Sequence, residues 1–116
     1  MGGGGGGWIV FVDVNGNVVR DAADTVLAAH PPFEDNISFA VDAAATPFIQ
    51  FGVNGFPTGV IAAGTPITNI QLCDDRGDVD TVGGIAAGRW IQIGPTGRPQ
   101  TYRTRAEVQG DPVGGC

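Results

Sequence analysis

The chain has 116 residues and a mass of 11.8 kDa, a size that fits one domain with a modest hydrophobic core. Twelve Asp and Glu residues face six Arg residues, so the net charge is −6, and this acidic balance argues against a protein coated in nucleic acid. Hydrophobic residues make up 42% of the chain, which is too much for a disordered acidic tail. No apolar run approaches the roughly 18 to 20 residues of a membrane-spanning helix.

The chain opens on a methionine and six glycines, which offer an ordered domain almost nothing to pack. We interpret residues 1–7 as an artificial linker that replaces a natural N-terminus. Residues 8–116 then form one domain, because no segment repeats another and no second region of different composition follows.

The first informative segment predicts a β-hairpin. Residues 8–14 are β-branched and aromatic, and residues 18–20 continue this character after the Asn15-Gly16 pair. Asn-Gly between two such runs is the strongest short hairpin signal, because both turn residues must accept a positive φ. Residues 21–29 are the only segment that we expect to be helical, for about two turns.

The rest of the chain predicts short strands separated by turns. We expect strands at residues 36–44, 47–53, 58–63, 67–73 and 89–94, a polar edge strand at 98–108, a turn at 54–57, and an acidic, Gly-rich loop at 74–84. Pro99 lacks an amide donor and should mark a sheet edge or a bulge. Strands spaced about 8 to 12 residues apart predict a mainly β fold with two antiparallel sheets.

The two cysteines, Cys73 and Cys116, are too far apart for a CxxC metal or redox motif. They could form one disulfide, remain as two inert thiols, or include one reactive cysteine. We favour the disulfide, because it would anchor a terminal Cys116 that otherwise has nothing to pack against. A bridge that closes a loop of about 44 residues would contribute roughly 4 kcal/mol on the loop-entropy model, and it implies an oxidising compartment.

No catalytic constellation is visible. The chain has a single histidine, His30, beside two prolines, and a single serine, Ser38, inside an expected strand. A nucleophilic triad needs an activated nucleophile next to an oriented base, and this pair does not predict one. We therefore expect His30 to be an ordinary loop residue, and the protein to have no catalytic residues, no cofactor and no enzymatic activity.

The segment from Asp13 to Asp24 places oxygen-bearing side chains at positions 1, 3, 5, 9 and 12, which is the spacing of an EF-hand calcium loop. Position six is Val18 instead of glycine, and Asp24 is shorter than the usual bidentate glutamate. We expect a hairpin and no tight calcium site. A second group of four carboxylates, at residues 74–80, should be a solvated loop, so no metal site is predicted.

Charge is distributed unevenly. Residues 1–84 carry a net charge of −8, whereas residues 85–116 carry +2. On an extended strand, Arg103 and Arg105 share one face, and Arg98, Gln100 and Tyr102 share the other. These arginines could grip phosphates while the tyrosine stacks on a base. The interpretation that we favour is a solvated edge strand that charge protects from mispairing.

Three segments of the chain together resemble the GspH/FimT family, the pseudopilins of type II secretion and the minor pilins of type IV pili. Residues 8–21 are similar to the family's first hairpin, with the pattern GWIVFxDxNxNGxRD. Residues 72–77 are similar to its LCDxRG strand and loop, and residues 91–99 to its final hairpin with a Gly-Arg pair. The order and spacing of these segments agree from Trp8 to about Tyr102.

The resemblance implies a periplasmic globular head of two β-sheets that is not an enzyme. In the family this head is carried on a long N-terminal helix, which a prepilin peptidase cleaves and which anchors the subunit in the bacterial inner membrane. That pilin helix is missing from this chain, so an apolar strip should be exposed where it belongs. The implied partners are other minor pilins and the major pilin, and the implied location is the inner membrane, the periplasm and the pilus.

We therefore expect a minor pilin of a type IV pilus that assembles through protein–protein contacts in pilus initiation or at the tip. One alternative is a pseudopilin of a type II secretion system. Another is a DNA-binding minor pilin for DNA uptake, because some family members bind DNA through a C-terminal Gly-Arg-X-Arg motif. Here Gly97 and Arg98 match that motif, but Gln100 replaces the second arginine, with Arg103 and Arg105 nearby.

Overall fold

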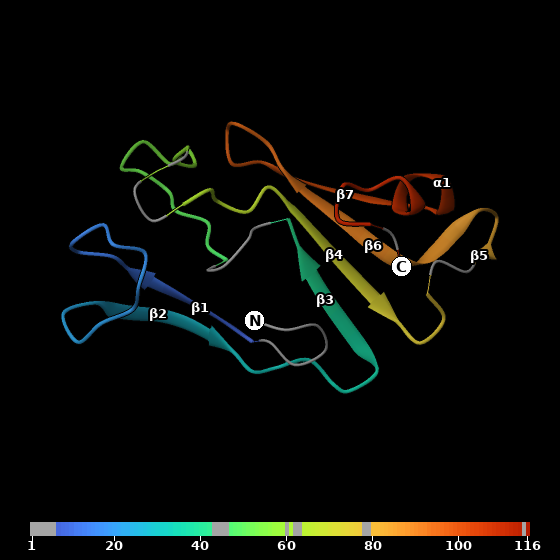
Figure 1. The fold of residues 1–116 in the computed structure, drawn as a ribbon, viewed down its shortest axis with the longest axis horizontal. Helices are drawn as coiled ribbons and strands as arrows, with labels where there is room; N and C mark the ends of the chain where they lie inside the picture. Colours follow the sequence, from blue (N-terminus) through green and yellow to red (C-terminus); the bar gives the residue numbers. More distant parts are fainter. Residues whose placement is uncertain (1–6, 43–46, 60, 62–63, 78–79, 115) are drawn as a thin grey trace.

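A computed structural model describes residues 7–42, 47–59, 61, 64–77, 80–114 and 116. It confirms the mainly β fold, with two antiparallel sheets that lie side by side in Figure 1. The elements run in the order β1 (Trp8–Val12), β2 (Thr25–His30), β3 (Ile37–Val41), β4 (Asn69–Asp74), β5 (Asp80–Val82), β6 (Ile85–Ile93), β7 (Pro99–Thr104) and α1 (Arg105–Gln109). Among the described residues, no helix is long and apolar enough to cross a membrane.

The smaller sheet is the two-stranded ribbon of β1 and β2 (the ribbon), which pair from Trp8 opposite His30 to Val12 opposite Thr25. A bulge between Val10 and Phe11 leaves Leu27 as the extra residue on β2. Two predictions were therefore wrong. The partner of β1 is not the segment 18–20, and residues 25–30 form a strand instead of a helix. The apolar side chains of this strand pair with β1, and such tertiary pairing overrides a weak helical propensity.

The larger sheet has five strands in the order β3-β4-β6-β5, with β7 paired to β6. It confirms the strands expected at 36–44, 67–73 and 89–94, although β6 begins earlier than expected. Alternation explains this success: Asn69 and Gln71 of β4 are buried on one face, while Ile70 and Leu72 lie on the other, opposite apolar residues of β3. The strand β5, inside the loop expected at 74–84, was missed.

The segment between β3 and β4 does not form the two strands expected at 47–53 and 58–63. Apart from the isolated bridges Phe51–Pro57 and Ile61–Gly64, its described residues close on themselves through turns. The turn at 54–57 is confirmed, with Gly55 at a φ of +80°. Residues 43–46, 60 and 62–63 lie outside the described residues.

The polar strand expected at 98–108 is shorter than predicted, because the chain turns from β7 directly into α1. Pro99 is the first residue of β7, and this strand pairs only with β6 in the described sheet, as its proline requires. Thr104 then accepts a hydrogen bond from the backbone of Glu107, whose side chain accepts one from the backbone of Thr104. This capping box starts the helix where the strand was expected to continue.

The core is small, and its fully buried side chain belongs to the C-terminal helix. The buried apolar side chains of the described residues are Val108, with no exposed surface, Ala86 and Ile67. By contrast, every residue of β2 is exposed. The C-terminal sheet therefore carries the packing of the molecule, and the ribbon carries little of it.

Candidate functional site

The disulfide between Cys73 and Cys116 is present, with the two Cα atoms 5.7 Å apart, and this prediction is confirmed. It ties the last residue of the chain to β4, near the middle of the larger sheet. Gly88 of the neighbouring strand β6 makes room for it. A Cβ atom on Gly88 would clash with the Sγ of Cys116 and would lie 3.1 Å from the carbonyl oxygen of Leu72. The absence of a side chain at Gly88 therefore allows the C-terminal residue to pack closely against β6.

Polar contacts hold the rest of the tail against the same face of the sheet. The buried carboxylate of Asp111 accepts a hydrogen bond from the buried amide of Gln71. Its other oxygen accepts hydrogen bonds from the backbone of Val113 and Gly114, at 2.7 and 2.9 Å. Buried polar groups with such partners avoid the penalty of desolvation, so the tail is a built part of the fold.

The loop at residues 13–24 is organised by its own carboxylates. Asp13 accepts hydrogen bonds from the backbone of Gly16, Asn17 and Val18, at 2.8 to 3.2 Å. Asp24 accepts them from the backbone of Val14 and Asp21. The oxygens that EF-hand spacing assigned to calcium thus bind amide hydrogens, and no metal-ligand group is found among the described residues. The Asn15-Gly16 signal marks a tight turn inside this longer loop.

Val18 has a backbone φ of +56°, a left-handed conformation that is unfavourable for a β-branched residue. Its amide donates to Asp13 at 2.8 Å, which helps to hold that conformation. In the family pattern aligned above, glycine stands at this position. Asp21, in the same loop, has a lowered pKa because Asn15 and the backbone of Ala23 donate hydrogen bonds to its carboxylate.

The carboxylates at 74–80 do not form a described cluster. Asp74 pairs with the guanidinium of Arg76, with a distance of 3.0 Å between Nε and Oδ2, and this pairing lowers the pKa of Asp74. Asp78 lies outside the described residues, and of Asp80 only the backbone is described. The pair at Asp74 and Arg76 is exposed and closes the turn after β4.

The structure does not bring His30 and Ser38 together, because they lie in different sheets. His30 is also not the loop residue that we expected. It ends β2, and its ring stacks on Trp8 with 4.1 Å between the ring centroids. Phe33 contacts both rings and continues to Phe39 of β3, so this row of aromatic side chains joins the ribbon to the larger sheet.

The candidate DNA-binding residues are divided between two places. Arg98 lies in the turn that precedes β7, whereas Arg103 lies near the end of β7 and Arg105 begins α1. At about 3.4 Å per residue, the two ends of this segment are roughly 20 Å apart. Side chains also alternate along the strand, so Gln100 and Arg103 point to opposite faces. The structure therefore groups Arg98 with Gln100 only.

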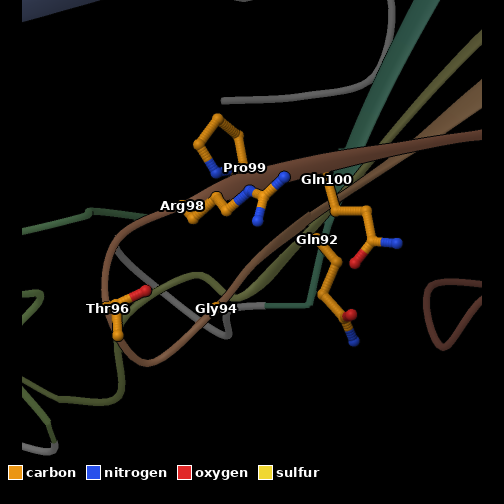
Figure 2. A pocket seen from close by; sticks show the side chains of 6 residues that line it. All are labelled: Gln92, Gly94, Thr96, Arg98, Pro99 and Gln100. Atoms are coloured by element: carbon orange, nitrogen blue, oxygen red, sulfur yellow. The ribbon is translucent and has the colours of Figure 1, made fainter.

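A pocket of about 300 Å³ lies at this hairpin, lined by Gln92, Gly94, Thr96, Arg98, Pro99 and Gln100. Gln92 and Gln100 are directly opposite one another in the pairing of β6 with β7. Figure 2 shows the Arg98 side chain extending towards Gln100, while the side chains of Gln92 and Gln100 extend to one side of the hairpin. None of the described residues that line the pocket is acidic.

Next to this pocket, two residues along the same pair of strands, lies an aromatic pair that sequence reasoning missed. Trp90 and Tyr102 stack with 4.2 Å between their ring centroids. The hydroxyl of Tyr102 donates to Oε1 of Gln92, and the indole nitrogen of Trp90 donates to Asn69. The signal that could have found them is the hairpin itself, since pairing about the turn at residues 94–97 sets Trp90 opposite Tyr102.

The ribbon exposes a large apolar surface. Its exposed side chains include Leu27 at 64%, and also Trp8, Ile9, Val10, Val12 and Val26. Neither strand contains Asp, Glu, Lys or Arg. An isolated two-stranded sheet is only marginally stable in water, and a contiguous apolar surface of this kind is typical of an interaction site.

Comparison with known proteins addresses the family. No curated protein and no solved structure matches this chain significantly. The family model for the type II transport protein GspH, however, matches residues 2–97, which is most of the chain. This match agrees with the resemblance in the sequence and with the two antiparallel sheets, and the chain belongs to the GspH family.

Proposed function

We propose that this protein is a minor pilin of a type IV pilus, which assembles through protein–protein contacts in pilus initiation or at the tip. Membership of the GspH family supports the coarser role of a pseudopilin or minor pilin, in type II secretion or in type IV pili. Members of the family are structural subunits and not enzymes. The proposed partners are other minor pilins and the major pilin.

The observation that carries the proposal is the uncovered ribbon. Burial of an apolar side chain such as Leu27 stabilises a complex by about 1.5 to 3 kcal/mol when it becomes complete. The ribbon offers several such side chains and no charge that would oppose burial. A subunit of an assembly needs such a surface.

We further propose that, in the natural protein, a membrane-anchoring helix precedes residue 8 and covers one face of the ribbon. β1 starts at Trp8, so a preceding helix would reach the domain beside the aromatic row of Trp8, His30, Phe33 and Phe39. Residues 1–7 would stand in place of this helix, and residues 8–116 would be the globular head in the periplasm. The apolar strip expected from the sequence corresponds to this face.

The test is genetic, in the bacterium that encodes the protein. Deletion of the gene should abolish surface pili while leaving secretion through the type II system intact. The opposite result would assign the protein to type II secretion and reject the pilus. Neighbouring genes for pilus or secretion components provide an independent check on the same choice.

Complementation tests the ribbon itself. The full-length gene should restore pili, whereas its Leu27→Asp variant should not, because a charge in the interface opposes burial. Val53→Asp is the matched control, since Val53 is fully exposed at 113% in the loop at 51–57. Restoration of pili by both variants would show that the ribbon is not an assembly surface.

A second candidate function is DNA binding for uptake. It is favoured by Arg98, which is exposed and whose guanidinium has no partner in the described part of the chain, and by Gln100 beside it, which stands at the position of the motif's second arginine. Because Arg103 and Arg105 lie away from this pocket, each side of β7 would contact DNA separately. Binding through Arg98 alone would be weak, micromolar or worse, with a logarithmic salt dependence near −1.

Fluorescence polarisation with short duplex DNA at low salt tests this candidate. Gln100→Arg completes the family motif and should tighten binding, while Arg98→Ala should weaken it. Arg103→Ala and Arg105→Ala show whether the other side of the strand contributes. If about 100 μM protein fails to bind and Gln100→Arg is equally inactive, DNA binding is rejected and the structural pilin remains.

A further inference from the structure

We infer that the pocket of about 300 Å³ at the β6–β7 hairpin is a binding site for a carboxylate group of a peptide. The pocket is at the lower end of the range for sites that hold small ligands. Its walls come from two paired strands and their turn, so their relative positions are fixed by the sheet. This inference does not depend on whether the protein serves a pilus or a secretion system.

The pocket combines the guanidinium of Arg98, which only donates, with side-chain amide and hydroxyl groups that can both donate and accept. Within the described part of the chain, the structure gives no partner to the guanidinium of Arg98, the amide of Gln100 or the hydroxyl of Thr96. The amide of Gln92 accepts from Tyr102 through its oxygen, which leaves its two N–H donors free. The ligand that satisfies these donors is rich in acceptors, and a planar carboxylate matches the fork of a guanidinium.

The surroundings favour a peptide over a nucleic acid. Pro99 forms one wall, and the exposed ring of Phe51 lies beside the turn, since a Cβ atom on Gly97 would be 3.0 Å from its Cε1. These apolar surfaces fit the carbon skeleton of a peptide. A nucleic acid strand would instead extend over a protein of net charge −6 and be repelled along its length. A single carboxylate depends mainly on charges within about 8 Å, the screening length at physiological salt.

The turn that shapes the pocket is specified by the sequence. Gly97 has a φ of +82°, which strains any other residue, and a Cβ atom there would lie only 3.0 Å from the ring of Phe51, which would have to shift. The amide of Gly97 donates to the carbonyl of Gly94, and the amide of Gly94 donates to the carbonyl of Arg98. The backbone of Arg98 is therefore held in place while its side chain remains available to a ligand.

The experiment is a titration of the isotopically labelled full chain, observed by NMR at the side-chain amides of Gln92 and Gln100 and at Nε–H of Arg98. The probe is the blocked tripeptide acetyl-Gly-Asp-Gly-amide, and its uncharged isostere acetyl-Gly-Asn-Gly-amide is the control ligand. We expect saturable shifts with a Kd of about 1 mM for the Asp peptide, and at least tenfold weaker binding of the Asn peptide.

Variants locate the site. Arg98→Gln should weaken binding of the Asp peptide about tenfold, because it removes a charge-assisted pair. Arg103→Gln removes the same charge from the opposite face of β7 and should leave the affinity unchanged. Equal binding of the two peptides, or unchanged binding to Arg98→Gln, would overturn the inference. If a short oligothymidylate moves the same signals at lower concentration than the peptide, the pocket belongs to a nucleic acid instead.

Discussion

The two sheets of this protein differ in how their apolar side chains are covered. In the larger sheet, the C-terminal helix and tail lie over one face, bury Val108 completely and are fastened by the bridge from Cys116 to Cys73. In the ribbon, nearly every apolar side chain is exposed, although its composition is that of a buried strand. One part of the chain therefore covers its own apolar side chains, whereas the other leaves them exposed.

The two tryptophans make this comparison measurable, because Trp8 lies in the ribbon and Trp90 in the larger sheet. The variants Trp8→Phe and Trp90→Phe leave one fluorescent reporter each. In urea, the ribbon should lose its structure before the larger sheet, since a two-stranded sheet is marginal alone.

Removal of the disulfide should have the largest effect. The double variant Cys73→Ser, Cys116→Ser should lower the free energy of unfolding reported by Trp90 by about 4 kcal/mol, because the unfolded chain regains the entropy of the open loop. The transition of Trp8 should shift much less. Equal shifts of both reporters would show that the two sheets unfold as one unit, and the comparison would fail.

A buried charge in the larger sheet should come next. Val108→Asp places a carboxylate where no surface is exposed, and it should lower the free energy of unfolding by about 3 kcal/mol or more. Val53→Asp makes the same substitution at a fully exposed position and should change it by less than about 0.5 kcal/mol. Urea titrations of both variants measure these changes in the free energy of unfolding. A similar loss in both would mean that α1 does not cover a core.

Val18→Gly should stabilise the loop that joins the strands of the ribbon. Glycine adopts a φ near +56° without strain, so the variant should gain about 1 kcal/mol in the transition reported by Trp8. Val19→Gly, at an exposed neighbour without a positive φ, should instead lose stability slightly. A gain reported only by Trp90 would contradict the assignment of this loop to the ribbon.

The smallest expected effect is a change in how the stability of the protein depends on pH in acid. Burial raises the pKa of Asp42, but hydrogen bonds from Thr68 and Asn69, at 2.6 to 3.0 Å, outweigh it and lower the pKa overall. A lowered pKa stabilises the folded state at neutral pH, and this stabilisation is lost as the pH falls below about 5 and through the folded pKa.

In Asp42→Asn, the stability reported by Trp90 should therefore depend less on pH below about 5 than in the parent protein. Asp35→Asn is the control, because Asp35 is exposed and has no partner in the described part of the chain. Identical acid curves for the parent and Asp42→Asn would show that these hydrogen bonds do not couple to folding.

The strands that the sequence predicted correctly are those whose residues alternate between apolar and polar at period two, although in β4 the polar parity is the buried one. Residues 37–41 and 69–74 belong to this class, since one parity is apolar and packs against the neighbouring strand. The first hairpin was mispredicted for a physical reason. The Asn15-Gly16 pair does turn, but Asp13 and Asp24 bind the backbone of a longer loop, so the partner of β1 lies farther along the chain.

The features of the candidate site also divide into those that the sequence could predict and those that it could not. The disulfide was predictable because a terminal cysteine has few other uses. The helix α1 was missed although the spacing of Thr104 and Glu107 is a capping-box signal. The pocket could not be predicted from residue types alone, because Gln92 and Gln100 become neighbours only through the register of β6 with β7.

The bridge from Cys73 to Cys116 also has a mechanical consequence. It closes the chain after β4 into a covalent ring that contains β5, β6, β7 and α1. If tension is applied at the N-terminal end, as in a subunit held at one end of a fibre, the sheets can unfold but the backbone can extend only as far as Cys73. The stretched molecule would therefore retain a closed loop between Cys73 and Cys116. The size of this loop is set by the disulfide and not by the stability of the sheet.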